Sequence, residues 1–259
     1  MIRDRFNQNF EEYQRQRIIS LVPSITETLF DLGLGNQIIG VTRYCIYPIE
    51  AQQKHKIGGT KSPKLEFIKN LKPDLIFVNE EENTIDDFEQ LRQIAPTFVT
   101  YPKTVEEGFK LVYNLAKLLD VERNHIEFVR SNYDQLLTEV KKKEFPMKSV
   151  FCPIWKDPWM TINSDTYINS MLNLFNLENI FFGKTERYPR IELSEIREDI
   201  DLILLPDEPF KFGETEEEYL KTLKHFKNSK FYLINGSYVS WYGTRILKAL
   251  PYFLNLLSS

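Results

Sequence analysis

LEFIKNLKPDLIFV, at residues 65–78, combines one or two turns of amphipathic helix, a short charged break and a continuous apolar strand. The stretch LSEIREDIDLILL, at residues 193–205, repeats this pattern. Helices that alternate with strands in this way are typical of α/β folds built on a largely parallel sheet. The repetition predicts that the chain contains two such halves.

Each copy also lies downstream of a similar opening, in which a β-rich run leads into a helix: RIISLVPSITETLF at 17–30 and SVFCPIWKDPWMTINSDTYINSMLNLF at 149–175. In the first opening, Ser24 and Glu27 have the spacing of a capping box and predict a helix over 25–33. Two similar halves predict two Rossmann-like lobes. Open α/β sheets bind ligands at the carboxyl ends of their strands, so we expect a ligand cleft between the lobes.

A long helical segment separates the two halves. Residues 104–119 have the apolar spacing of one amphipathic helix, and residues 121–144 are strongly charged and contain neither Pro nor Gly. A helix of that second span would be about 36 Å long, whereas a flexible linker would need Gly and Ser. We therefore expect one long rigid helix between the lobes. The predicted division is a polar N-terminal extension at 1–16, an N-terminal lobe at 17–103, a helical segment at 104–146 and a C-terminal lobe at 147–259.

The composition excludes several classes of protein. The 259 residues are 42% hydrophobic and carry a formal net charge of -4, so they can form a sizeable core but have no basic excess for nucleic acid. No apolar run reaches the roughly 18 residues that a membrane helix needs, so we expect no membrane insertion. The N-terminus, MIRDRFNQNFEEYQRQ, lacks the apolar region of a signal peptide, which predicts a cytoplasmic protein for the chain as written.

Aromatic side chains concentrate in two loops of the second half. Trp155 and Trp159 lie in the first loop, and Tyr238, Trp241 and Tyr242 lie in the second. Aromatics in loops bounded by Pro and Gly do not belong to a helical stripe, so we expect some of them to line a cavity that suits a flat, largely apolar macrocycle. Packing in the core is the alternative, and it applies best to Trp159.

The first half contributes residues at its strand ends. Tyr44 and Cys45 close the stretch IIGVTRYC at 38–45, and Asn79 ends the strand of the first copy; we expect these side chains to reach the cleft. Cys152 occupies a comparable strand-end position in the second half. Free cysteines are usually small buried hydrophobes, and a disulfide between the lobes or a shared ligand thiolate is the alternative.

No motif indicates chemistry on the ligand. The sequence has no G-x-S-x-G, P-loop, H-E-x-x-H or G-x-G-x-x-G pattern, and two cysteines with three histidines are too few for a metal-cluster enzyme. We expect no catalytic residue, no metal site and no intrinsic cofactor. Arg43, Arg187, Arg190 and Arg245 are candidates for clamping a carboxylate or phosphate, with pairing to surface acids as the alternative.

Three stretches follow one another in the order and spacing of a known family. They are RIISLVPSITETLFDLGLGNQIIGVTRYCIYP, GGTKSPKLEFIKNLKPDLIFVNEEEN and INGSYVSWYGTRILKALPYF. They resemble three parts of the helical-backbone periplasmic binding proteins. The first stretch resembles the first strand, helix and second strand of that family, and the second resembles the next loop, helix and strand. The third resembles the last strand, the cleft loop and the closing helix. These proteins serve cobalamin, haem and ferric-siderophore ABC importers. The resemblance covers residues 17–256 and is closest to the cobalamin-binding branch.

The resemblance implies a non-catalytic receptor, usually periplasmic or on the cell surface, that holds a cobalamin-like corrinoid for the permease dimer of an importer. Thr60 and Lys61 match the region where cobalamin receptors place a cleft tryptophan, and Tyr238 matches the cleft aromatic of the second lobe. Glu66 matches an acid that docks on the transporter, and Ser240 replaces a second docking acid. We expect a monomer. The alternatives are a ferric-siderophore or haem receptor, a cytosolic corrinoid carrier or sensor, and a metal-cofactor enzyme on a related fold.

Overall fold

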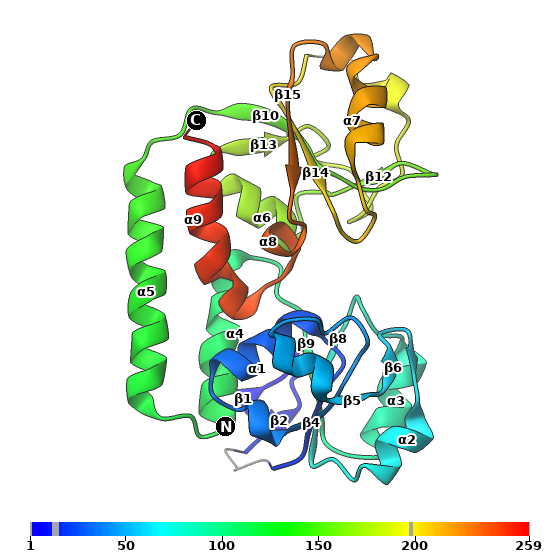
Figure 1. The fold of residues 1–259 in the computed structure, drawn as a ribbon, viewed down its shortest axis with the longest axis vertical. Coiled ribbons are helices and arrows are strands. Elements are labelled where there is room, and N and C mark those ends of the chain that lie inside the picture. The colour runs from blue at the N-terminus through cyan, green and yellow to red at the C-terminus, as the bar shows by residue number, and fades with distance from the viewer. Residues whose placement is uncertain (1, 12–15, 197–198, 259) are drawn as a thin grey trace. The chain divides into compact units, whose positions relative to one another are not determined.

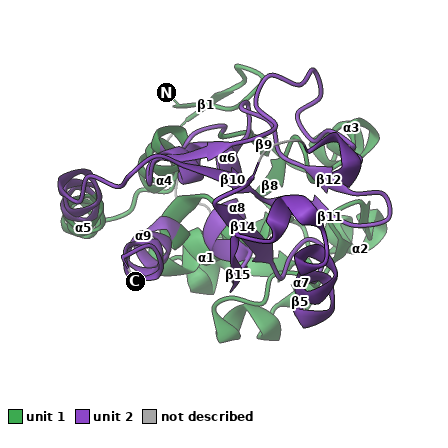
Figure 2. Ribbon diagram, turned by 90° about the horizontal axis from the view of Figure 1, so that it is seen from above, with its two compact units in different colours: residues 1–102, 106–133, 242–245 green, residues 103–105, 134–241, 246–259 purple. Residues whose placement is uncertain are grey.

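The computed structural model describes residues 2–11, 16–196 and 199–258. The chain forms two compact units (Figures 1 and 2). Unit 1 comprises residues 1–102, 106–133 and 242–245, and unit 2 comprises residues 103–105, 134–241 and 246–259. Residues 1 and 12–15 of the predicted N-terminal extension lie outside the described residues.

Among the described residues of unit 1, five strands form one sheet. Their order is β5-β4-β3-β8-β9, and every neighbouring pair is parallel. The strands are β3 (Ile18–Ser20), β4 (Ile38–Val41), β5 (His55–Lys56), β8 (Leu75–Asn79) and β9 (Thr97–Thr100). Because parallel strands run in one direction, all of their carboxyl ends lie at one edge of the sheet, as the alternation of strands and helices predicts.

Helices and short turns connect these strands. They are α1 (Pro23–Asp31), α2 (Leu65–Asn70), α3 (Ile85–Arg92), the 3-10 helices η1 (Gly35–Gln37) and η2 (Ile49–Gln53), and the antiparallel hairpin of β6 (Gly58–Gly59) and β7 (Ser62–Pro63). Ile68 of α2 and Phe88 and Leu91 of α3 pack with Ile76 and Val78 of β8 in one hydrophobic core. This packing fits the unbroken apolar run of β8, whose residues are all buried.

Helix α1 begins two residues earlier than the capping-box pattern predicts. Its N-terminal cap is Val22, which makes no side-chain capping hydrogen bond, and Pro23 lies in the first turn. Proline suits that position because its missing N–H would have no helical partner there. Glu27 instead forms a buried ion pair with Arg245, with 2.7 Å between Oε2 and Nε. The predicted capping box at Ser24 is therefore wrong.

The N-terminus forms a hairpin against the edge of this sheet. Strands β1 (Ile2–Arg3) and β2 (Asn9–Phe10) pair antiparallel. The Phe10 ring lies 5.0 Å from the Phe98 ring of β9, and the backbone N–H of Arg5 donates to the Val99 carbonyl at 2.9 Å. The hairpin thus covers part of the open edge of β9, whose backbone groups would otherwise face solvent. Nothing in the polar composition of this segment predicts that role.

The helical segment is present as expected. Helix α4 spans Val105–Leu118, and α5 spans Arg123–Lys142. The 20 residues of α5 correspond to about 30 Å, and the helix continues unbroken through residues 133 and 134, where the division between the units falls. Within unit 1, the Phe109 ring of α4 stacks on the Tyr133 ring of α5, with 3.6 Å between ring centroids.

Unit 2 is also built on a parallel sheet. In the part of this unit that the structure describes, the order of the four strands is β13-β10-β14-β15. They are β10 (Lys148–Phe151), β13 (Leu177–Asn179), β14 (Leu202–Pro206) and β15 (Lys230–Ile234). The remaining elements are the antiparallel strands β11 (Pro153–Trp155) and β12 (Met160–Thr161), the helices α6 (Tyr167–Asn173), α7 (Glu214–Lys221), α8 (Ser237–Ser240) and α9 (Ile246–Leu256), and the 3-10 helices η3 (Leu193–Glu195) and η4 (Lys224–Phe226). The 3-10 helix η5 (Gly243–Arg245) belongs to unit 1.

The repeated sequence pattern is only partly matched in structure. In the first copy α2 precedes β8 as predicted, and in the second copy β14 forms where a strand is predicted. The predicted helix before β14 is wrong, because the described residues of this stretch contain only the three-residue η3, and residues 197–198 lie outside the description. Leu193, Ile196 and Ile200 pack on the core of unit 2, so their apolar spacing belongs to an irregular segment.

Candidate functional site

The carboxyl edge of the unit 1 sheet carries a buried polar network. Asn79 ends β8 and Thr100 ends β9, and both hydrogen-bond the Tyr242 hydroxyl, at 2.9 Å from Asn79 Nδ2 and 2.8 Å from Thr100 Oγ1. All three side chains are buried. Burial raises the pKa of Tyr242 far above that of a free tyrosine, so the hydroxyl stays protonated. Tyr242 thus lies in unit 1, although the sequence groups it with a loop of the second half.

Asn83 links this network to the turn that carries Thr60 and Lys61. The Asn83 side chain accepts the backbone N–H of Asn79 at 2.9 Å and donates to the Thr60 carbonyl at 2.5 Å. Thr60 and Lys61 lie between β6 and β7, where Thr60 is half-buried and Lys61 is exposed. The structure therefore brings the predicted strand-end residue and the predicted loop residues to the same edge of unit 1.

Tyr44 and Cys45 are neighbours with opposite environments. Tyr44 is 48% exposed, and the Arg43 guanidinium lies 5.0 Å from its ring centroid. Cys45 is fully buried, with its sulfur 3.1 Å from the Thr26 hydroxyl and 3.2 Å from the Thr42 hydroxyl. Burial raises the pKa of the Cys45 thiol and disfavours the thiolate. Tyr44 is therefore accessible at the surface of this loop, whereas Cys45 packs inside unit 1 against Thr26 and Thr42.

The carboxyl edge of the unit 2 sheet carries aromatic side chains. Trp155, at the end of β11, is 43% exposed and makes an edge contact with Phe210, with 5.8 Å between ring centroids. Phe210 lies in the loop after β14 and packs on Phe212 at 4.7 Å. Asp207 of the same loop accepts the backbone N–H of Gly236 at 2.7 Å. This hydrogen bond joins the loop that supports Trp155 to the loop that leads into α8.

The other predicted aromatics of unit 2 are less accessible. Tyr238 of α8 is half-buried, and its ring lies 4.9 Å from the Tyr252 ring of α9. Trp159 stacks on Phe212 at 5.8 Å and packs against the core of unit 2, as the alternative interpretation of this residue expects. Trp241 is also buried.

The two positions matched to transporter docking differ in exposure and charge. Glu66 is exposed in the first turn of α2. Ser240 is half-buried at the end of α8, and its hydroxyl donates to the Gly236 carbonyl at 2.8 Å. Of these two positions, only Glu66 offers a charged group to a partner.

Two of the four candidate arginines are already engaged by carboxylates. Arg187 pairs with Asp165 at 2.8 Å, and Arg245 pairs with Glu27 at 2.7 Å. Arg43 lies against a tyrosine ring. Pairing with a surface acid, the alternative stated from the sequence, therefore describes Arg187, whereas the acid that pairs with Arg245 is buried.

The described residues contain no group of three or more His, Cys, Asp or Glu side chains that could hold a metal ion. Cys45 and Cys152 are both free and buried, and burial raises the pKa of Cys152 to about 12. Both thiols are therefore buried, as free cysteines usually are, and Cys45 exposes no surface with which to reach a cleft.

Three residues of these edges were absent from the sequence-based selection: Asn83, Thr100 and Phe210. Thr100 ends β9 just as Asn79 ends β8, so the same strand-end argument selects it. Phe210 follows the end of β14, but the acidic residues Asp207 and Glu208 come first after that strand, and they make the loop look polar in sequence. Asn83 has no sequence signal of its own, because its role depends on the fold of the β6–β7 turn.

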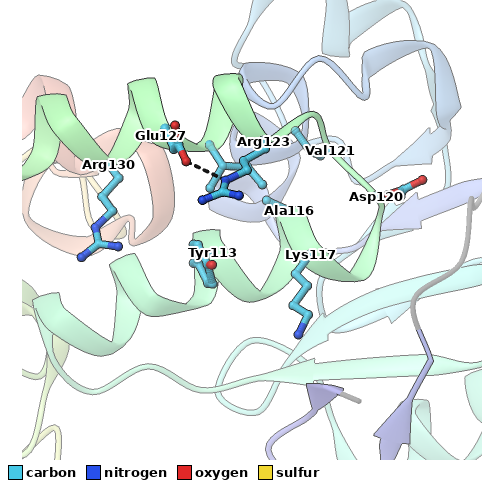
Figure 3. A pocket seen from close by; sticks show the side chains of 9 residues that line it. Tyr113, Ala116, Lys117, Asp120, Val121, Arg123, Glu127 and Arg130 are labelled. Atoms are coloured by element: carbon cyan, nitrogen blue, oxygen red, sulfur yellow. Dashed lines mark hydrogen bonds and ion pairs between the residues drawn. The ribbon is translucent and has the colours of Figure 1, made fainter.

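A separate groove lies on unit 1 between α4 and α5 (Figure 3), with a volume of about 390 Å³. Its lining includes the cations Lys117, Arg123 and Arg130 and the acids Asp120 and Glu127, and Arg123 pairs with Glu127 at 2.7 Å. Two of the three cations are thus balanced by acids, and none of the predicted ligand residues lines the groove. We assign no ligand to this groove.

None of the helices described here combines the length and apolar character needed to cross a bilayer.

Comparison with known proteins gives consistent findings. Residues 18–232 match a family model described as periplasmic binding protein. An uncharacterized ABC transporter substrate-binding lipoprotein of Bacillus subtilis is 25% identical over 245 residues, covering 91% of this chain and 77% of that protein. A vitamin B12-binding protein of Vibrio parahaemolyticus is 27% identical over 184 residues, covering 70% of this chain and 66% of that protein.

A solved structure supports the fold. The crystal structure of the periplasmic vitamin B12 binding protein BtuF of Vibrio cholerae matches with a TM-score of 0.80 at 22% identity, covering 94% of this chain and 97% of that chain. At this identity the likeness concerns the fold, and it confirms the two-lobed α/β class predicted from the sequence.

Proposed function

Because the chain belongs to the family of periplasmic binding proteins, we propose that it binds a cobalamin-like corrinoid and presents it to the permease of an ABC importer. The family consists of binding proteins rather than enzymes. The names of two similar proteins, both vitamin B12-binding, support the choice of corrinoid. Since an importer receives its substrate on the outer side of the cytoplasmic membrane, we place the protein on that side.

The observation that carries the proposal is an exposed aromatic ring at the carboxyl edge of each sheet. Tyr44 follows β4 in unit 1 and is 48% exposed, and Trp155 lies beyond β10 in unit 2 and is 43% exposed. Ligands of parallel α/β sheets bind at this edge. An aromatic ring offers a broad apolar face, which suits a flat macrocycle better than a small polar solute.

The polar residues of the same edge support a binding role without chemistry. Asn79, Thr100 and Tyr242 hydrogen-bond one another and hold the ends of β8 and β9 in place. Such a fixed edge loses little conformational entropy when a ligand binds. We therefore propose that Tyr44, Thr60, Lys61, Trp155 and Tyr238 contact the ligand and that Asn79 and Tyr242 hold the edge beneath it.

The experiment that tests this function is isothermal titration of the purified protein with cyanocobalamin, with a ferric siderophore and haem titrated separately. We expect saturable one-to-one binding of cyanocobalamin. Binding of haem or the ferric chelate in its place would redirect the ligand within the family. Silence with all three would overturn the proposed function and leave the fold unchanged.

We predict that Trp155→Ala and Tyr238→Ala each weaken cyanocobalamin binding roughly tenfold or more, because each removes an aromatic contact. Phe128→Ala is the matched control, since Phe128 is 65% exposed on α5 and lies far along the chain from both strand-end loops. Titration measures the affinities, and circular dichroism checks that each variant keeps the native fold. Unchanged affinity in both aromatic variants would place the site elsewhere.

A further inference from the structure

The loop after β4 exposes more apolar surface than a solvent-facing turn requires. Tyr44, Ile46, Tyr47 and Ile49 are 48%, 42%, 39% and 65% exposed, so four large apolar side chains lie within six residues. Single exposed apolar residues are ordinary, whereas four in one short loop are more than a loop that only faces water needs. We call these four residues the β4 patch. This patch follows the carboxyl end of a parallel strand, where the ligand of such a sheet binds.

One aromatic ring of this loop, that of Tyr47, lies against the guanidinium of a buried arginine, Arg245. The Arg245 guanidinium carbon lies 4.4 Å from the Tyr47 ring centroid. Arg245 pairs with Glu27 of α1 at 2.7 Å, and the two side chains are only 4% and 1% exposed. The neighbouring Thr244 is held as well, since its backbone N–H donates to the Thr28 hydroxyl at 3.1 Å. Glu27 therefore holds the Arg245 guanidinium, and Thr28 holds the backbone of the residue before it.

Tyr44 offers the contrast. Its ring also has a guanidinium nearby, with Arg43 at 5.0 Å, but both side chains are exposed. A cation–π contact is weak at an exposed site and stronger where the cation is shielded from water. A guanidinium is planar and stacks well on aromatic faces. The buried Arg245 therefore fixes the Tyr47 ring more firmly than Arg43 fixes the Tyr44 ring.

We propose that Tyr47 contacts the ligand and that the Glu27–Arg245 ion pair is the device that positions its ring. The proposal rests on the proposed function and adds a residue to it. One part of the Tyr47 ring lies on the guanidinium, and the exposed part is presented to the apolar face of the macrocycle. Glu27 and Arg245 act through Tyr47, and they touch no ligand themselves.

The positioning is tested first without ligand. A guanidinium that lies over an aromatic ring has its Nε–H proton resonance shifted by the ring current. We expect the Arg245 Nε–H signal to move in Tyr47→Leu and to stay close to its native position in Tyr47→Phe, which keeps the ring. An Arg245 signal that is unchanged in Tyr47→Leu would overturn the positioning.

Ligand contact is tested by titration with cyanocobalamin. Tyr47→Leu should weaken binding about tenfold, and Tyr47→Phe should stay within about threefold, because the ring and not the hydroxyl makes the contact. Tyr113→Leu is the matched control, since Tyr113 is 50% exposed on α4, away from the strand ends. Equal affinity of Tyr47→Leu and the native protein would overturn the contact.

A double-mutant cycle joins the two tests. The variant Glu27→Gln with Arg245→Met removes both charges together and so leaves neither buried charge uncompensated. In that background, Tyr47→Leu should weaken binding by less than about threefold, since the ring is no longer held. An undiminished tenfold effect would overturn the role of the ion pair. If the native protein does not bind cyanocobalamin, both the proposed ligand and its contact with Tyr47 are overturned. The Arg245 Nε–H signal still shows, without ligand, whether the guanidinium lies over the Tyr47 ring.

Discussion

Gly243 lies where the chain returns to unit 1 for four residues, and it has two reasons to be glycine. Its φ is +88°, in the left-handed region, and a Cβ built there would lie 2.1 Å from Thr28 Oγ1. The close approach is needed because the same hydroxyl accepts the backbone N–H of Thr244 at 3.1 Å. Arg245, which contacts the Tyr47 ring, directly follows Thr244. The position of a proposed ligand contact thus depends on a glycine far from it in sequence.

We predict that Gly243→Ala destabilises the protein more than Gly33→Ala does. Both glycines have positive φ, at +88° and +78°, so each alanine costs about 1–2 kcal/mol of backbone strain. A Cβ at Gly33 meets nothing within 4 Å, whereas one at Gly243 overlaps Thr28. Urea unfolding followed by circular dichroism gives both free energies. Equal losses would show that the overlap relaxes without cost.

Among the single elements, α2 is a short helix with one side buried in the core and the other side exposed to solvent. Ile68 is buried in the core of unit 1, while Glu66, Phe67 and Lys69 are exposed. The apolar spacing that fixes this helix on the sheet therefore leaves Glu66 free of core packing. Since Ser240 carries no charge, we propose that Glu66 is the one of these two positions that supplies a charged docking contact.

We predict that Glu66→Lys abolishes stimulation of the importer's ATPase activity without changing ligand affinity. If a cation of the transporter pairs with Glu66, as the proposed docking requires, the reversal brings two like charges together, and like charges repel. Glu89→Lys is the matched control, because Glu89 is also exposed and lies on a different helix, α3. The measurement uses proteoliposomes that contain the importer of the same organism. Full stimulation by Glu66→Lys would remove this residue from the docking surface.

At the scale of the whole molecule, α5 is the long connection that the sequence predicts. It spans Arg123–Lys142 without Pro or Gly, and it does not break where the units divide. Breaks in helices usually need Pro, Gly or an inserted bulge. We therefore predict that the radius of gyration, measured by small-angle X-ray scattering, changes little when ligand is added. A large decrease would show that the connection bends or that the units close on the ligand.

Local patterns explain how much of the fold the sequence predicts. The strands at Leu75–Asn79 and Leu202–Pro206 and the helices α4 and α5 follow from apolar runs and helical spacing within a few residues. The segment around η3 shows where such prediction fails. Its apolar residues have helical spacing and pack on the core of unit 2, but its described residues form only a three-residue 3-10 helix. Spacing predicts which residues are buried before it predicts the backbone that buries them.

The sequence by itself determined the parallel α/β class, the long helix and the strand-end loops that carry Tyr44 and Trp155. Only the tertiary structure decided that Tyr242 lies in unit 1 on Asn79, 163 residues away, and that Glu27 pairs with Arg245. Periodicity reports which face of an element is apolar. Hydrogen bonds and ion pairs between residues far apart in the sequence form only when the folded chain brings those residues together, so no local sequence pattern predicts them.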